Sequence, residues 1–308
     1  MARRQIGQES LSFGVERKGS GCLDELSCVI DWSEIDRLLG DVYASPKGEE
    51  GWPPLALFKA LLLSVWYDLS DVKLAEALGE RASFRRFCGF AMSEPTPERT
   101  AFVRFRNELV ARDLDAQLFD AVLAQLEAMG VVVKTGTLID ATVLPSASKG
   151  DDEARWVGHR RKKPVHGYKA HVASDAETDI VRAVAVTTAN VHDLKKAEEV
   201  LPEAPGDVYA DTAYAAHRFE TAIMAHGGTP RIVQRGIWSK DPQALERWNG
   251  PIRRVRCRIE KIFGTWKRSY GLRSVRYWGL ARVACQVRLT AIAFNLKRAN
   301  RLLLTQAA

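Results

Sequence analysis

The segment Thr137–Leu144, TLIDATVL, decides the fold of this chain. Its residues are mostly β-branched or aliphatic, a composition typical of a β-strand. Asp140 interrupts the apolar run at its centre. An isolated carboxylate in such a strand is costly to bury unless a hydrogen-bond partner or a metal ion accompanies it. A turn or capping role is the alternative, and a strand interior disfavours it. Asp140 is therefore a candidate functional residue.

Strand and helix patterns alternate after this segment, following a hairpin whose turn is 175–179. A hairpin followed by strand–helix units predicts an α/β fold, a mixed sheet flanked by helices. One expected strand, Asp207–Thr212, ends near Asp211. The polar, basic segment Ser146–Pro164 is expected to be an exposed loop. The expected strands are 137–144, 168–174, 180–188, 207–212 and 229–234, and the expected helices are 194–201, 215–225, 244–266 with a break near Pro251, and 280–304.

The first third of the sequence predicts short helices, separated at Gly79 and at the Pro95–Pro97 break. Arginines lie along several of them. This pattern is compatible with an all-α N-terminal domain of the helix-turn-helix-like, DNA-binding kind. Any small helical bundle would give the same pattern, so both interpretations stay open.

Charge is distributed unevenly along the 308 residues. From Arg231 onward there are 18 Lys and Arg against 3 Asp and Glu, whereas the remainder has 27 against 35. A basic quarter on an acidic chain indicates a surface that binds a polyanion. A solvated basic surface is the alternative. Aromatic residues between the arginines favour nucleic acid, because they can stack on bases.

Several classes of protein are excluded or disfavoured. Five cysteines without paired spacing argue against a disulfide framework or a zinc ribbon and favour a reducing cytosol. No signal peptide or membrane-spanning segment is expected. The histidines match no zinc pattern, and Asp193 is expected to cap a helix. No phosphate-binding glycine loop for ATP is present.

The basic stretch Arg253–Tyr277, RRVRCRIEKIFGTWKRSYGLRSVRY, contains a single carboxylate, Glu260. A lone acid among bases could simply form an ion pair. The alternative is that Glu260 joins Asp140 and Asp211, which lie on strands that would be sheet neighbours. Three such carboxylates suit Mg²⁺, and two ions can activate the attacking oxygen and stabilise the leaving oxygen in phosphodiester cleavage.

These residues resemble the bacterial insertion-sequence transposases of the DDE class, most closely the insertion-sequence-five group of the insertion-sequence-four superfamily. The resemblance rests on LIDAT around Asp140, YADTAY around Asp211, and the pattern Arg256-x3-Glu260-x6-Lys267. The segments GYKAH (167–171) and ANVHD (189–193) are similar to the same group. The superfamily pattern often has a tyrosine three residues before the arginine, and Arg253 occupies that position here.

The resemblance implies a ribonuclease-H-like catalytic core with Asp140, Asp211 and Glu260 as the catalytic, metal-binding residues for Mg²⁺ or Mn²⁺, two ions being expected. Arg256 and Lys267 would hold DNA phosphates, and we expect Arg253 and Arg268 to contact DNA with them. The expected domains are 1–130, helical, for DNA binding or dimerisation, and 131–308, catalytic, with basic C-terminal helices.

The implied function is metal-dependent cleavage at terminal inverted repeats and strand transfer into target DNA. The implied partners are double-stranded DNA and a second copy of the chain, as a homodimer on DNA, in the cytoplasm at the nucleoid. Two alternatives remain. A nuclease of the same fold would cleave without strand transfer, and a catalytically silent, domesticated transposase would only bind DNA.

Overall fold

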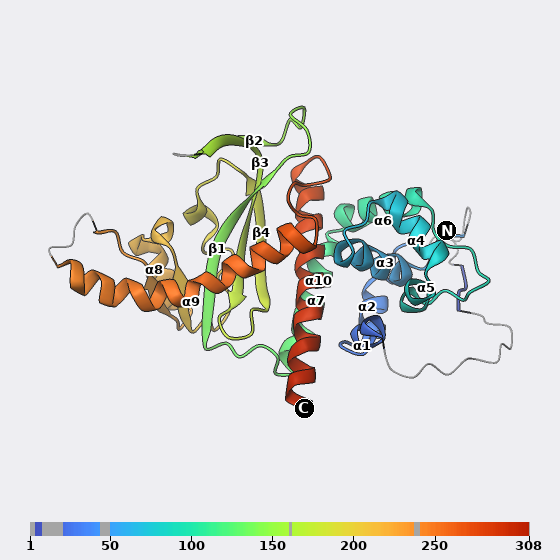
Figure 1. The fold of residues 1–308 in the computed structure, drawn as a ribbon, viewed down its shortest axis with the longest axis horizontal. Helices are drawn as coiled ribbons and strands as arrows, with labels where there is room; N and C mark the ends of the chain where they lie inside the picture. The colour runs from blue at the N-terminus through green and yellow to red at the C-terminus, as the bar shows by residue number, and fades with distance from the viewer. Residues whose placement is uncertain (1–3, 8–20, 44–49, 160–161, 237–240, 308) are drawn as a thin grey trace. The chain divides into compact units, whose positions relative to one another are not determined.

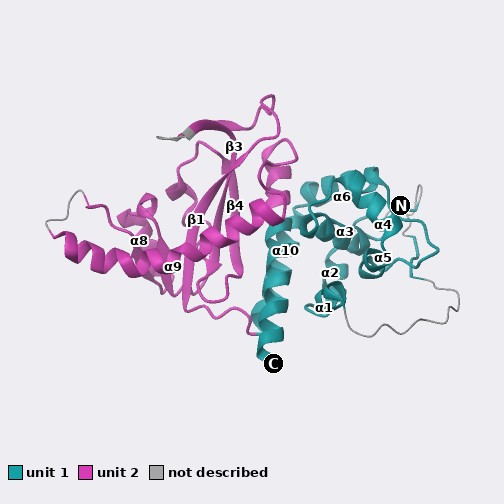
Figure 2. Ribbon diagram, in the orientation of Figure 1, with its two compact units in different colours: residues 1–129, 288–308 teal, residues 130–287 magenta. Residues whose placement is uncertain are grey.

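The computed structural model describes residues 4–7, 21–43, 50–159, 162–236 and 241–307 (Figure 1). The chain divides into two compact units, which Figure 2 colours separately. One comprises residues 1–129 and 288–308, and the other residues 130–287. Within the described ranges, the helices are all too short or too polar to cross a bilayer.

The first unit is built from helices, as the sequence predicts. Side chains cap two of its helices: that of Asp31 accepts a hydrogen bond from Ser33 N, and that of Ser70 accepts one from Lys73 N. Phe58 and Phe102 are fully buried in the core. The helices are α1 (Cys22–Ser27), α2 (Trp32–Leu38), α3 (Pro54–Trp66), α4 (Asp71–Glu80), α5 (Ala82–Cys88), α6 (Arg99–Ala111) and α7 (Leu114–Ala128).

The last helix, α10 (Leu280–Ala307), begins in the second unit and continues into the first from residue 288. The expected division places all of 131–308 in one domain, whereas residues 288–307 of α10 pack within the first unit. The reason is local packing and polar contact. Trp66 Nε1 donates to Ala293 O at 2.8 Å, and Arg288 pairs with the buried Asp115 at 2.7 Å.

The second unit contains one mixed sheet with strand order β4–β3–β1–β5–β6. Three antiparallel strands are followed by two parallel ones, so the ribonuclease-H-like arrangement expected from the resemblance is confirmed. The strands are β1 (Gly136–Pro145), β2 (Arg155–His159), β3 (Lys162–Asp175), β4 (Val181–Thr188), β5 (Asp207–Ala210) and β6 (Thr229–Ile232).

Helices cover both faces of this sheet. Side chains alternate between the faces along a strand. Ile139 points to the face where Phe219 and Ile223 of α8 (His217–Ala225) complete a buried cluster. Asp140 therefore points to the other face, which α9 (Pro242–Ser269) crosses (Figure 1). The alternation of β1 thus places Asp140 beneath the helix that contains Glu260.

Part of the basic segment 146–164, expected to be a loop, forms strand structure instead. Strand β2 pairs with the first residues of β3, in register from Arg155↔Gly167 through Trp156↔His166. The Val157↔Val165 pair explains the difference, because β-branched residues favour strand pairing even within a basic segment. Residues 160–161 lie outside the described part of the chain.

The expected helix 194–201 is also shorter than predicted. It is the 3₁₀-helix η1 (Asp193–Lys196), and His192, not Asp193, caps it by accepting from Leu194 N at 3.3 Å. The predicted cap at Asp193 is therefore wrong.

The predicted break in α9 near Pro251 is likewise wrong, because the helix continues from Pro242 to Ser269. Asn249 explains this continuity. Its side chain is fully buried, accepts from Gln234 N at 2.9 Å and donates to Gln234 O at 3.0 Å. These two bonds hold the first half of α9 to the residues that follow β6. They offset the hydrogen bond that a proline removes from a helix interior.

Replacing Asn249 with alanine should destabilise the second unit. The change removes two hydrogen bonds to the backbone of Gln234, each of which contributes about 0.5–1.5 kcal/mol. Urea unfolding followed by circular dichroism measures the effect. The control is Gln243→Ala, an exposed position in the first turn of the same helix. Equal midpoints for the two variants would contradict the role given to Asn249.

Candidate active site

Asp140, in the interior of β1, and Asp211, directly after β5, lie side by side on two neighbouring parallel strands. The register of β1 and β5 pairs Leu138 with Tyr209, and each aspartate follows two residues later. Neighbouring strands are about 4.8 Å apart, so the two carboxylates occupy adjacent positions. The Asp211 side chain accepts from Ala213 N at 2.8 Å and caps the 3₁₀-helix η2 (Thr212–Tyr214). This bond fixes Asp211 at the end of its strand.

Arg256 of α9 forms an ion pair with one of these carboxylates, that of Asp140. Its Nη2 lies 3.0 Å from Asp140 Oδ2, and the side chains are only 20% and 14% exposed. Burial raises the pKa of Asp140, Arg256 opposes that rise, and the charge of Asp211 adds to it. Burial alone would lower the pKa of Arg256, but Asp140, Asp211 and Glu260 outweigh it and raise that pKa. Asp140, Asp211 and Glu260 therefore all raise the pKa of the same guanidinium, that of Arg256.

Glu260 lies one helical turn after Arg256 and is exposed. The spacing of four residues places both side chains on the same side of α9. In the part of the chain that the structure describes, no group of three or more His, Cys, Asp or Glu residues could hold a metal ion. The Arg256 guanidinium has Asp140 as its direct partner. All three carboxylates raise the pKa of this guanidinium and so favour its positive charge.

The other cations that the sequence singled out divide into two kinds. Lys267 faces the sheet, where its Nζ donates to Thr142 Oγ1 at 2.6 Å and to Val143 O at 3.2 Å. Arg253 and Arg268 are exposed on α9, and Arg253 pairs with Glu246 at 2.9 Å. Arg256 thus contacts Asp140 directly and Lys267 contacts β1 two and three residues farther on, whereas Arg253 and Arg268 are exposed.

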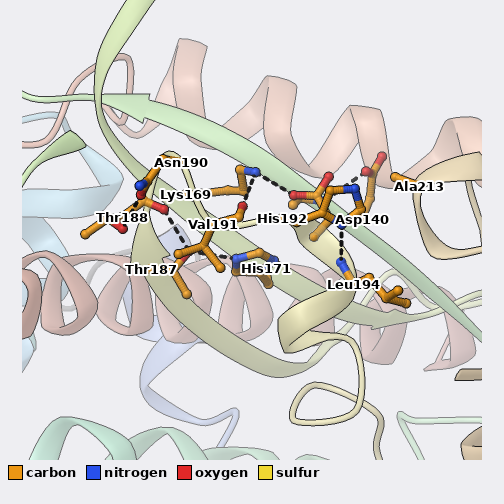
Figure 3. Close-up of polar contacts among 12 residues, drawn as sticks. Asp140, Lys169, His171, Thr187, Thr188, Asn190, Val191, His192, Leu194 and Ala213 are labelled. Atoms are coloured by element: carbon orange, nitrogen blue, oxygen red, sulfur yellow. Dashed lines mark hydrogen bonds and ion pairs between the residues drawn. The ribbon is translucent and has the colours of Figure 1, made fainter. Parts of the chain in front are cut away.

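A buried ion pair near Asp140 was missed by the sequence reasoning (Figure 3). Lys169 of β3 is 8% exposed, and its Nζ contacts Asp193 Oδ1 at 2.7 Å and Val191 O at 2.6 Å. A lysine inside the apolar strand that contains GYKAH was the available signal, since a buried ammonium needs a partner. Lys169 therefore holds the ANVHD segment against the sheet.

Tyr214 connects this pair with the aspartates. The residue is fully buried, and its hydroxyl has no hydrogen-bond partner among the described residues. Burial raises the pKa of Tyr214, and the charges of Asp193, Asp140 and Asp211 raise it further. The phenol is thus kept protonated, so a neutral group lies between the carboxylates.

The three histidines considered as metal ligands have other roles here. His171 bonds Thr187 Oγ1 at 2.9 Å, and burial lowers its pKa to about 4. His166 bonds Ala154 O at 3.2 Å, and His192 caps η1. These are the hydrogen-bonding roles that the sequence favoured.

Two family models match this chain. Residues 133–296 match the model described as a transposase DDE domain, and residues 15–108 match one described as a transposase domain. Among solved structures, the piggyBac transposase synaptic complex with hairpin DNA is similar at a TM-score of 0.48 and 9% identity. The alignment covers 90% of this chain and 73% of that one.

Removing the cation of the buried Lys169–Asp193 pair should destabilise the second unit strongly. Lys169→Met leaves Asp193 without its partner near two further carboxylates, and breaking a buried pair costs about 3–5 kcal/mol. The double variant Lys169→Met/Asp193→Leu should recover much of this loss, because no uncompensated charge remains. Chemical unfolding of the single and double variants measures both effects.

The matched control is Lys196→Met, which removes the lysine of the more exposed Lys196–Glu199 pair. Such surface pairs contribute at most about 1 kcal/mol. A Lys169→Met variant as stable as this control would show that the buried pair has no special role.

Proposed function

This chain belongs to the transposase DDE domain family and is an enzyme of DNA transposition, and on that premise we propose that Asp140, Asp211 and Glu260 form its catalytic, metal-binding triad. The observation that supports the proposal is the electrostatic arrangement around Arg256. One guanidinium pairs with Asp140 and is stabilised by all three carboxylates, which come from β1, the end of β5 and α9.

The donor type suits a hard divalent cation, and the proposal rests on this chemistry, since the three carboxylates do not form a metal-sized group among the described residues. Carboxylate oxygens are the ligands that Mg²⁺ and Mn²⁺ prefer, and adjacent carboxylates in a largely buried position need positive charge. DDE transposases generally use divalent metal ions, and two ions, Mg²⁺ or Mn²⁺, are the proposed cofactors here. Bound ions would activate the attacking oxygen and stabilise the leaving oxygen. Asp140 and Asp211 would hold them from the sheet, and Glu260 from the helix.

The basic side chains of α9 are proposed to contact DNA phosphates. Arg256 lies among the carboxylates with a bidentate fork suited to phosphate, and Lys267 lies beside it over β1. We propose that these two hold the phosphates flanking the scissile bond. Arg253 and Arg268, both exposed, would contact the backbone farther away.

The proposed reaction is hydrolysis followed by transesterification. Water attacks the phosphodiester at the transposon end, so that the P–O bond to the leaving strand breaks and a 3′-hydroxyl is released. That hydroxyl then attacks a phosphodiester of target DNA in the same site. Terminal inverted repeats are the proposed substrate, and the insertion-sequence-five group is the proposed subfamily.

The proposed assembly is a dimer, because two transposon ends must be held together. We propose a homodimer on DNA, acting in the cytoplasm at the nucleoid. The helical residues 1–130 would serve DNA binding or dimerisation. The family model that matches residues 15–108 supports their role in transposition, and Arg99 and Arg104, which are exposed on α6, support contact with DNA, whereas Arg106 is buried against Asp71.

Substituting any triad carboxylate should abolish end cleavage while DNA binding persists. Asp140→Asn, Asp211→Asn and Glu260→Gln each remove a proposed metal ligand, and we expect at least a hundred-fold loss of 3′-hydroxyl product from a labelled duplex with the flanking terminal repeat. Chelation of Mg²⁺ should abolish cleavage by the wild type equally. Gel electrophoresis of the labelled strand measures the product.

Asp207→Asn is the matched control, because Asp207 begins the strand whose end bears Asp211 and pairs there with Arg231. It should retain activity within a few-fold. Cleavage that survives Glu260→Gln would remove Glu260 from the triad. A cleaved end that never joins a second duplex would replace transposition with simple nuclease action.

The exposed arginines should set the salt dependence of binding. Each phosphate contact contributes about one unit to the slope of log affinity against log salt concentration. Arg253→Ala and Arg268→Ala should each lower this slope by about one, and affinity should fall similarly for any duplex sequence. Arg218→Ala on α8, at the opposite face of the sheet, should leave the slope unchanged. Unaltered slopes in the α9 variants would exclude these phosphate contacts.

A further inference from the structure

The paired β2 and β3 form a ribbon that continues past the end of β1 (Figure 1). The last residue of β1, Pro145, pairs with Gly167, and Gly167 also pairs with Arg155, where the ribbon begins. Trp156 and His166 are the next pair, with ring centroids 5.2 Å apart. Trp156 is 56% exposed, which is unusual for so large an aromatic side chain.

Trp156 lies on the same face of the sheet as Asp140. The β1–β3 register pairs Asp140 with Val172, and His166 is six residues from Val172 along β3. An even separation places side chains on one face of a strand. Since Trp156 is opposite His166, the indole belongs to the face that α9 crosses, at a point that α9 leaves exposed.

The C-terminal half of α9 and the turn after it follow β1 toward this ribbon. Arg256 contacts Asp140, Lys267 contacts Thr142, and beyond the helix Val275 N donates to Pro145 O at 2.8 Å. The exposed Arg273 lies between the last two contacts, with its Nε donating to Lys267 O at 3.2 Å. Cationic residues therefore lead from the active site to the base of the ribbon.

A second exposed tryptophan lies at this base. Trp278 is 52% exposed and directly precedes Gly279, whose Cα is packed against Glu153. The Glu153 carboxylate accepts from Leu280 N at 2.8 Å, and Glu153 is three residues before Trp156. This contact ties the segment with Trp278 to the segment with Trp156.

Resting on the proposed function, we propose that Trp156 with His166 and Trp278 form a second DNA-contact surface for the transposon-end duplex. Six residues of strand span about 20 Å, and B-DNA advances about 34 Å per ten base pairs. The aromatic surface therefore contacts sugars and bases about six base pairs from the cleaved bond. Because the bases of a duplex are stacked on one another, the rings pack against deoxyribose and groove edges of the terminal repeat, whereas the phosphates are held by the cations between.

Wild type, Trp156→Ala and Trp156→Phe are compared on a duplex with the flanking terminal repeat and on an unrelated duplex of equal length. Loss of the aromatic contact should weaken binding to the terminal repeat about five- to hundred-fold, without changing the salt slope. Trp156→Phe should retain most of the affinity. Met224→Ala is the control, because Met224 is 54% exposed on α8 at the opposite face.

Hydroxyl-radical footprinting gives an independent readout in Ca²⁺, without turnover. Wild type should protect sugars about five to seven base pairs from the cleavage position, and Trp156→Ala should lose that protection while protection at the cleaved bond persists. Equal melting temperatures of the variants exclude misfolding as the cause.

An unchanged footprint and affinity in Trp156→Ala would overturn the inference and leave the proposed function standing. Equal losses on both duplexes would assign the surface to target DNA and overturn its assignment to the transposon end. A wild type that binds neither duplex would overturn both the inference and the proposed function.

Discussion

The ion pair between Asp140 and Arg256 is the contact on which the second unit depends. It joins the central strand of the sheet to the helix that crosses it, at a largely buried position. A carboxylate in a strand interior is tolerable only with a compensating charge, and a guanidinium there is tolerable only with acids around it. Each partner thus compensates the charge of the other. Together they fix where Glu260 and Lys267 lie along β1.

Much of this arrangement could be predicted from sequence, because its signals are local. An aspartate at the centre of TLIDATVL conflicts with its surroundings, and the order of strands and helices leaves few topologies for the sheet. The four-residue spacing of Arg256 and Glu260 predicts a shared helix face. Membership of the transposase DDE domain family agrees with the function that these residues indicated.

The predictions that failed depended on partners distant in sequence. Asn249 sustains the helix through Pro251 by bonding Gln234, and Asp193 pairs with Lys169 instead of capping η1. Strand β2 forms because valines face each other across a basic segment. Propensity cannot identify such partners, since each depends on a register or packing contact that exists only in the folded chain.

The charges around Asp140 and Arg256 determine how a divalent cation and a DNA phosphate could both bind there. Asp140, Asp211, Glu260 and Asp193 provide four carboxylates, and Arg256, Lys169 and Lys267 are the cations in contact with the same two strands and loops. Lys169 contacts Asp193 and Val191, Lys267 donates to β1, and Arg256 pairs with Asp140. If a phosphate approached before any further positive charge, it would meet acids that one guanidinium cannot neutralise. On the proposed function, Arg256 would contact a phosphate fully only when a divalent cation held by Asp140, Asp211 and Glu260 offsets the charge of these acids, because the arginine cannot satisfy both anions with equal strength. The outer cations of α9, Arg253 and Arg268, would contact the duplex without that metal ion.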